Sequence, residues 1–205
     1  MRQANSRWWW LLVPLAVLGS GYLAARLRAP ATAEPLRSGD QVDPTLPGLS
    51  SATRPQAPFT VPAGNFLLLT FGYTSCPDVC PTTLIAVHDA LEQLGPEAQR
   101  VASVFITVDP ERDTAPRLAV YTAAFDPRIV ALTGSAPAIA RAAEKFHIRY
   151  AKQALRPGSS DYSMAHTAVL YVVDAAHRVI AAVPESGAPR EIAAAIVSAI
   201  RADSR

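Results

Sequence analysis

A chain of 205 residues, half of them hydrophobic, is long enough for one packed domain with additional segments. The formal net charge is only +2, and no basic stripe with interleaved aromatic residues is present. Both observations argue against nucleic-acid binding. Composition and charge therefore favour a single globular domain whose chemistry resides in a few particular residues.

The segment 1–28 predicts an N-terminal transmembrane helix. No residue between Arg7 and Arg26 is charged, and residues 8–25 are almost wholly apolar. A helix of that length spans about 27 Å, close to the thickness of the hydrocarbon core of a bilayer. The alternative is a cleaved signal peptide, because Ala31-Thr32-Ala33 resembles a small-residue cleavage site. Either way the remaining chain leaves the cytoplasm, and the anchor predicts a single-pass protein of the inner membrane that faces the periplasm.

Two further regions follow the apolar segment. Residues 29–62 are rich in Pro, Ala, Ser, Thr and Gly and show no periodic apolar pattern. We therefore expect a semi-extended linker there. Residues 63–205 are expected to form the folded domain.

In this domain, apolar runs alternate with amphipathic segments. The run Phe66 to Tyr73 is typical of a strand that is buried on both faces, and Pro81 places the start of the next helix near it. The elements expected after this helix are a strand at 101–108, a helix from the N-cap Thr114 to about 125, a strand at 129–132, a helix at 136–146, strands at 167–173 and 179–183, and a helix at 189–202. Such alternation requires parallel strands with covered faces. It predicts an α/β, thioredoxin-like fold with a central mixed sheet flanked by helices.

The two cysteines of the chain, Cys76 and Cys80, follow the first buried strand. On a helical turn, residues four apart share one face with Cβ atoms about 5–6 Å apart, whereas a disulfide requires about 3.8 Å. We expect Cys80 at the helix N-terminus, where the partial positive charge favours a thiolate. Because thiolates bind soft ions such as Cu(I), the pair can form a disulfide, hold a soft metal, or alternate between such states.

Four histidines could supply a third ligand. His88 is most simply a surface residue of the helix after the cysteines, His147 ends a helix, and His177 lies in an expected hairpin turn. His166 follows the polar loop 156–164 and begins an expected core strand, so its imidazole could reach the edge of the sheet. From position alone, His166 is either a metal ligand or a partly buried residue bonded to the backbone.

Two further features have a structural and a functional interpretation. The acidic residues Asp109, Glu111 and Asp113 could dock a partner, but a solvated loop that caps the following helix explains them as well. Met164 offers a thioether near His166, although methionine is more often a residue that fills gaps in a core.

The segment Phe71–Leu84 closely resembles the signature of the SCO/SenC copper proteins. The similarity continues in order through Val108–Thr114, Phe125–Pro127, Leu132–Gly134 and His166–Asp174. The resemblance implies a thioredoxin-like domain that binds copper through two cysteines and a histidine. These residues are Cys76, Cys80 and His166 in this sequence. We expect this ligand set to hold Cu(I) and to accept Cu(II) as well, since it resembles the trigonal ligands of copper electron-transfer sites.

The resemblance also implies partners. It predicts a metallochaperone that receives copper from another donor protein and delivers it to, or prepares, the dinuclear copper site of cytochrome c oxidase subunit II. The chain departs from the usual pattern at Ala165, where many members carry an acidic residue, and at Ser75, where a histidine is frequent. Neither departure removes a proposed ligand.

The alternative from a different functional class is a thiol–disulfide oxidoreductase that reduces cysteines of a partner outside the cytoplasm. It would require Cys76 and Cys80 but not His166. A permanent structural disulfide is less favoured, because closing so short a loop removes little chain entropy. A peroxide-reducing relative is less favoured still, since the sequence around Cys76 lacks the expected pattern.

Overall fold

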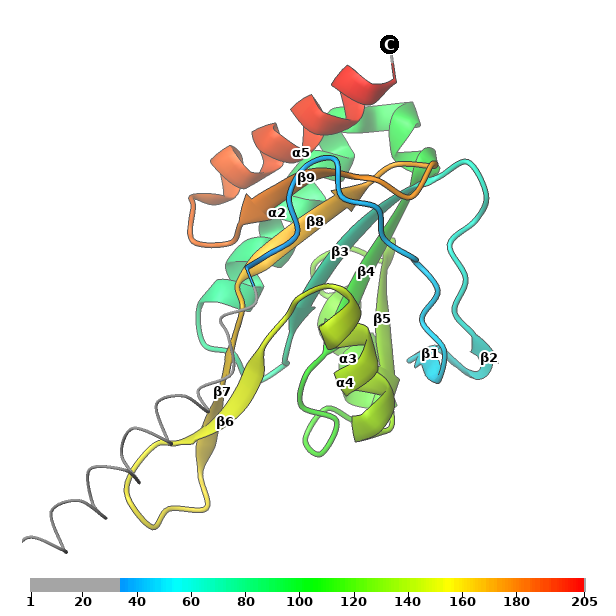
Figure 1. The fold of residues 1–205 in the computed structure, drawn as a ribbon. Helices are drawn as coiled ribbons and strands as arrows, with labels where there is room; N and C mark the ends of the chain where they lie inside the picture. The colour runs from blue at the N-terminus through cyan, green and yellow to red at the C-terminus, as the bar shows by residue number, and fades with distance from the viewer. Residues whose placement is uncertain (1–33, 205) are drawn as a thin grey trace, which may run out of the picture. The chain divides into compact units, whose positions relative to one another are not determined.

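In the computed structural model, which describes residues 34–204, a seven-stranded sheet has the order β2-β1-β5-β4-β3-β8-β9 (Figure 1). The strands are β1 (Leu49–Ser51), β2 (Arg54–Pro58), β3 (Phe66–Gly72), β4 (Val101–Thr107), β5 (Ile129–Gly134), β8 (Val169–Val173) and β9 (Val179–Pro184). β3, β4 and β5 run parallel, whereas β1 and β8 pair antiparallel with their neighbours. The expected mixed sheet is therefore confirmed.

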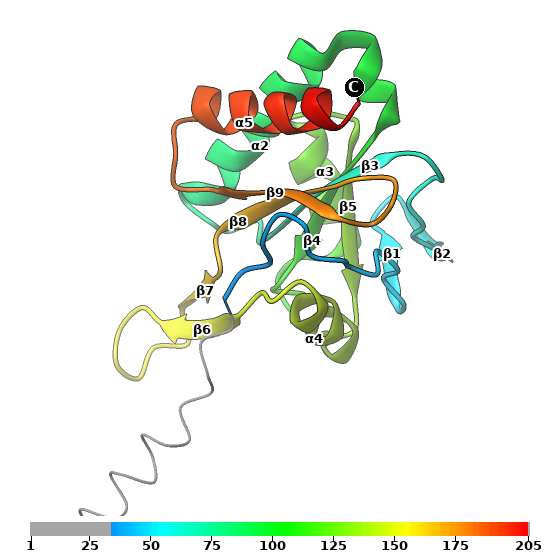
Figure 2. The same cartoon turned by 45° about the horizontal axis from the view of Figure 1, so that its top comes forward.

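Helices cover both faces of this sheet. They are α2 (Val79–Leu94), the 3₁₀ helix η2 (Gly95–Arg100), α3 (Ala115–Ala123), α4 (Ala136–Lys145) and α5 (Pro189–Asp203). Figure 2 shows α2, α3 and α5 on one face of the sheet and α4 on the other. Ring contacts agree with this arrangement, because Phe105 of β4 packs on Tyr121 of α3, whereas Phe71 of β3 packs on Phe146 after α4.

Local signals explain why these elements form where they do. Every residue of β3 is buried, as expected for a strand covered on both faces. The Thr114 hydroxyl accepts a hydrogen bond from the Arg117 amide at the start of α3, and Pro116 lies in the first turn. The prediction of Thr114 as an N-cap is thus confirmed. Ser135 caps α4 in the same way.

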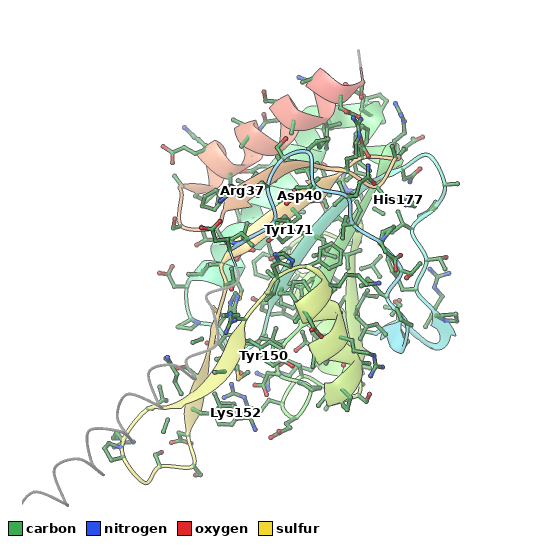
Figure 3. The ribbon with its side chains drawn as sticks, viewed as in Figure 1. Arg37, Asp40, Tyr150, Lys152, Tyr171 and His177 are labelled. Carbon is green, nitrogen blue, oxygen red and sulfur yellow. The ribbon has the colours of Figure 1, made fainter. Side chains whose placement is uncertain are left out.

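The linker assignment for 29–62 is wrong for residues 34–62, which pack on the domain. The buried core includes apolar residues of this segment, namely Leu36, Val42, Leu46, Leu49 and Ala52. The Leu36 amide donates to the Tyr171 hydroxyl at 3.1 Å, and Figure 3 shows Arg37 and Asp40 beside Tyr171. The segment has no regular period because it lies on the sheet as an irregular chain, and only β1 and β2 are strands.

The expected polar loop 156–164 is also wrong in part, because it contains a strand. β6 (Tyr150–Ala154) and β7 (Tyr162–His166) form a separate antiparallel pair that projects from the main sheet (Figure 1). Most of β6 is exposed and only Met164 of β7 is buried, so neither strand shows the apolar alternation that identifies a strand in sequence. His166 therefore ends β7 rather than beginning the core strand β8.

Within residues 34–204, no helix combines the length and apolar character needed to cross a bilayer. The transmembrane helix or signal peptide predicted for 1–28 lies outside the described residues.

Candidate metal centre

Three segments that are distant in sequence meet at the carboxyl end of β3. Cys76 lies in the turn after β3, Cys80 in the first turn of α2, and His166 at the end of β7. His166 Nε2 lies 3.9 Å from Cys80 Sγ. The structure thus brings the three sequence-predicted residues to one edge of the sheet.

Cys80 is held in place by close packing and is only 2% exposed. A Cβ atom added at Gly72 of β3 would lie 2.8 Å from Cys80 Sγ and 2.7 Å from Phe105 Cε2. Only glycine fits at position 72, and the resulting close approach of β3 seats the Cys80 sulfur against the strand.

Cys76 takes the capping role at the start of α2. Asp78, the N-cap residue, makes no side-chain capping bond, whereas Cys76 Sγ accepts the Cys80 amide at 3.4 Å. The Cys80 thiol also donates to this sulfur, and together these bonds lower the pKa of Cys76 to about 5. Cys76 is therefore a thiolate at neutral pH.

The expectation that Cys80 is the favoured thiolate is wrong. The hydrogen bond to Cys76, burial, and the charge on Cys76 all raise the pKa of Cys80. The helix N-terminus does stabilise a thiolate, but its N–H groups are directed at Cys76. In the metal-free protein one proton is thus held on Cys80 and shared with its neighbour.

The His166 ring is fixed by a backbone bond and an aromatic contact. Nδ1 lies 3.2 Å from the Thr167 carbonyl oxygen, and the Tyr73 ring meets the imidazole edge-on with centroids 6.3 Å apart. Donation from Nδ1–H leaves the lone pair of Nε2 free on the side that faces Cys80. Histidine metal ligands in proteins are usually fixed in this way.

The donor set suits a soft metal ion. Ligand bonds of about 2.0 Å to imidazole and 2.3 Å to thiolate place the two donor atoms about 3.7 Å apart in a trigonal site. The observed 3.9 Å between His166 Nε2 and Cys80 Sγ is close to that value. Two sulfurs and one imidazole are also the ligand types that select copper over hard cations.

Comparisons with known proteins agree with this geometry. Residues 57–201 match the family model described as SCO1/SenC. The chain belongs to the SCO1/SenC family. A "SCO2-like protein" of Rickettsia felis is 35% identical over 129 residues, which is 63% of each chain. A second Rickettsia relative, from R. conorii, is 38% identical over 55% of each chain. This SCO1/SenC chain thus spans somewhat more than half the length of these curated relatives.

Two solved structures share the fold of this SCO1/SenC protein. Bradyrhizobium japonicum ScoI with copper bound is 32% identical, with a TM-score of 0.64 over 80% of this chain and 98% of that one. Apo Sco1 of Thermus thermophilus is 35% identical, with a TM-score of 0.63 over 82% and 99% of the two chains. The thioredoxin-like fold class is confirmed by this similarity.

The loop between β4 and α3 holds the turn of the candidate site that carries Cys76. Asp113 is 1% exposed, and its carboxylate accepts the Thr74 amide at 3.0 Å, the Thr74 hydroxyl at 2.5 Å and the Thr107 hydroxyl at 2.7 Å. Arg117 donates to the hydroxyls of Thr74 and Ser75 at 2.7 and 3.1 Å. These bonds fix the turn that carries Cys76.

Both interpretations of the acidic residues, a surface that docks a partner and a solvated loop, are therefore wrong for Asp109 and Asp113, which are both 1% exposed. Glu111 does face solvent, with a side chain 67% exposed that pairs with Lys152. Charge in the sequence does not separate these roles, because Thr74 and Tyr162, which bind Asp113 and Asp109, lie 39 and 53 residues away in the chain.

Glu185 is a buried carboxyl near the cysteines that the sequence does not reveal. It is 2% exposed, accepts a hydrogen bond from Thr70, and has Oε2 without a hydrogen-bond partner. Burial, together with the negative charge on Cys76, raises the pKa of Glu185 to about 7. No local sequence pattern marks such a residue, since its environment is made by β3 and α2.

The remaining histidines and Met164 lie outside the three-residue site. His88 is only partly exposed, because its Nδ1 pairs with Asp126 at 2.9 Å. Glu92 belongs to the same cluster, but the Arg128 guanidinium lies 2.5 Å from Glu92 and 2.6 Å from Asp126, where a metal cation would bind. We interpret this cluster as an ion-pair network. Met164 is 7% exposed in the core, as expected for a residue that fills a gap.

Proposed function

We propose that this chain is a metallochaperone that binds copper through Cys76, Cys80 and His166. The observation that carries the proposal is the approach of His166 Nε2 to Cys80 Sγ at 3.9 Å, with Nδ1 bonded to the backbone. Copper is present in the structures of ScoI from Bradyrhizobium japonicum and Arabidopsis thaliana, which are 32% and 31% identical to this chain. These relatives support copper as the cargo.

The asymmetry of the two thiols suits capture and release of this cargo. Cys76 is already deprotonated at neutral pH and can bond the incoming ion first. Cys80 then has to lose its proton, since the thiolate is the form that binds metal. Release follows the reverse order: an incoming cysteine of the recipient displaces one ligand at a time, which an open edge of the sheet permits. Both Cu(I) and Cu(II) suit the set of two thiolates and one imidazole.

The proposed recipient is the dinuclear copper centre of cytochrome c oxidase subunit II, and a second copper protein is the proposed donor. The family membership and the copper-bound relatives support this assignment. We further propose that residues 1–28 anchor the protein in the inner membrane, with residues 34–204 in the periplasm.

Copper titration of the reduced protein under anaerobic conditions tests the proposal. We expect one equivalent of Cu(I) per wild-type chain, and a lower affinity for His166→Ala in competition with a chelator. Cu(II) loading should give an intense visible thiolate-to-copper band that shifts in His166→Ala. His88→Ala is the matched control, because this histidine lies in the ion-pair network, and it should match wild type. Equal affinities and spectra for His166→Ala and wild type would remove His166 from the site.

The pKa asymmetry also supports a second candidate function, reduction of a partner's disulfide. The Cys76 thiolate would attack one sulfur and release the other as a thiolate. Cys80 would then attack the mixed disulfide, leaving Cys76–Cys80 oxidised and the partner fully reduced. This activity needs both cysteines and no imidazole ligand. Full reductase turnover by metal-free His166→Ala would favour it over copper delivery.

A further inference from the structure

Two neighbouring residues in the loop between β4 and α3 contact the two halves of the candidate site. Asp113 holds Thr74, two residues before Cys76, and Arg112 contacts Tyr162, four residues before His166. We propose that Arg112 is a positioning residue that holds β7 on the domain so that His166 faces Cys80. Its effect on copper rests on the proposed function, whereas the placement of the imidazole can be measured without metal.

The contact between Arg112 and Tyr162 has three parts. Arg112 Nη1 donates to the Tyr162 carbonyl oxygen at 2.9 Å, and its guanidinium carbon lies 3.8 Å from the centre of the Tyr162 ring. The Tyr162 hydroxyl donates to Asp109 Oδ1 at 2.9 Å, and Asp109 also binds Arg112 Nε. Backbone, ring face and hydroxyl of one residue are thus held by a single ion pair, in which the Asp109 carboxylate is buried and the Arg112 side chain is 29% exposed.

Fixing Tyr162 also fixes the orientation of His166, because alternate residues of a strand share one face. Residues 162, 164 and 166 of β7 lie on the same face. Met164, between the other two, is 7% exposed and belongs to the core, so this face is turned toward the domain. A strand released at Tyr162 could twist or lift away and carry the imidazole with it.

The hairpin makes a second contact with the same loop, and it provides an internal comparison. Lys152 of β6, labelled in Figure 3, pairs with Glu111, and the two side chains are 45% and 67% exposed. Exposed pairs of this kind contribute little to stability. The Arg112 contact, in contrast, involves Asp109, which is 1% exposed. Of the two contacts, that of Arg112 should determine the position of β7.

The effect of Arg112 on the proposed copper site is measured as copper affinity. Loss of a partner that orients a metal ligand typically weakens metal binding about 10- to 100-fold. We expect a loss in that range for Arg112→Ala, but not more than the loss for His166→Ala, because the effect is transmitted through His166. The double variant should then match His166→Ala alone. Lys152→Ala should retain copper like wild type.

A metal-free measurement locates the imidazole directly. Magnetisation transfer between the His166 ring and the Cys80 side chain, whose Sγ lies 3.9 Å from Nε2, should be observed in wild type and Lys152→Ala and be lost in Arg112→Ala. The Tyr73 ring is not a suitable reporter, because the Arg112 guanidinium carbon lies 5.7 Å from its centre. Arg112→Lys keeps the positive charge but not the planar donor set, so it should resemble Arg112→Ala. It also serves as the test variant if the alanine variant does not fold.

The outcomes separate the two hypotheses. A wild-type chain that binds no copper, but loses the contact between His166 and Cys80 on Arg112 substitution, refutes the proposed function and keeps the positioning role. Persistence of the contact between His166 and Cys80 in both Arg112 variants overturns the positioning role. Additive losses in the Arg112→Ala/His166→Ala double variant, or wild-type behaviour of Arg112→Lys, overturn it as well.

Discussion

At the scale of single residues, Cys76 and Cys80 have the same chemistry and opposite environments. The Cys76 sulfur accepts hydrogen bonds from the Cys80 thiol and from backbone N–H groups at the start of α2. The Cys80 sulfur, in contrast, is buried against Gly72 and Phe105. One turn of helix thus creates a thiolate and a protonated thiol, and their different tasks follow from this difference.

Alkylation of the reduced, metal-free protein tests this asymmetry. Because the pKa of Cys76 is about 5, its alkylation rate should rise through pH 5 and reach a plateau before pH 7. Cys80 should stay largely unmodified across this range. Cys80→Ala should move the Cys76 midpoint upward, since the donating thiol is lost. A wild-type rate that still rises between pH 8 and 9 would contradict the assignment.

Glu185 predicts a pH-dependent stability. Its pKa is raised from 4.5 to about 7 in the folded protein, so the native state binds more protons than the unfolded state between these values. The Glu185 contribution is therefore fully present below pH 4.5 and is lost as the pH rises through 7. Glu185→Gln should be more stable than wild type at pH 8, by at most about 3 kcal/mol, and the difference should vanish near pH 4.

Urea unfolding of the reduced proteins at pH 4 and pH 8 measures this effect. The exposed Glu111 supplies the control, because Glu111→Gln should follow wild type at both values. If the difference in free energy of unfolding between Glu185→Gln and wild type is the same at pH 4 and pH 8, the buried carboxyl does not titrate in this range.

At the scale of elements, the close approach of β3 to α2 is the feature that shapes the site. Gly72→Ala would place a methyl group 2.8 Å from Cys80 Sγ, and overpacking of this kind costs about 1–3 kcal/mol. We expect this variant to be destabilised and also to lose copper more readily, because the sulfur has to move.

Gly134→Ala is the matched control for this prediction. Its Cβ would lie 2.4 Å from the Gly48 carbonyl oxygen, between β5 and β1 and away from the cysteines. This variant should lose stability but keep the copper affinity and visible spectrum of the wild type. Equal copper loss per folded chain in both glycine variants would show that the effect at Gly72 is general destabilisation.

The elements also show what can be read from the sequence. β3 and α3 are predicted because an apolar run and the capping Thr114 are local signals. The β6–β7 hairpin and the irregular segment 34–62 are missed, since tertiary contacts rather than periodicity stabilise them. Likewise, the resemblance points to the two cysteines and His166, but not to the groups that hold them. Asp113 and Thr74, for example, are 39 residues apart and meet only in the fold.

At the scale of the whole molecule, residues 34–62 complete the core, which predicts the outcome of truncation. A chain that starts at residue 63 lacks the buried residues Leu36, Val42, Leu46 and Leu49. Burial of each such side chain contributes about 1.5–3 kcal/mol, so their loss is comparable with the whole stability of a typical domain.

We expect a chain starting at residue 63 to be unfolded or aggregated in buffer without urea. A chain starting at residue 34 should be folded in the same buffer and should unfold cooperatively when urea is added. Urea titration followed by circular dichroism makes the comparison. Equal unfolding midpoints for the two chains would mean that residues 34–62 contribute no stability.

The most direct test of the proposed copper site is X-ray absorption at the copper edge of the Cu(I)-loaded protein. The wild-type spectrum should fit two sulfur ligands and one imidazole nitrogen, and His166→Ala should lose the nitrogen and keep both sulfurs. A wild-type spectrum without an imidazole contribution, or with fewer than two sulfurs, would contradict the site built from Cys76, Cys80 and His166.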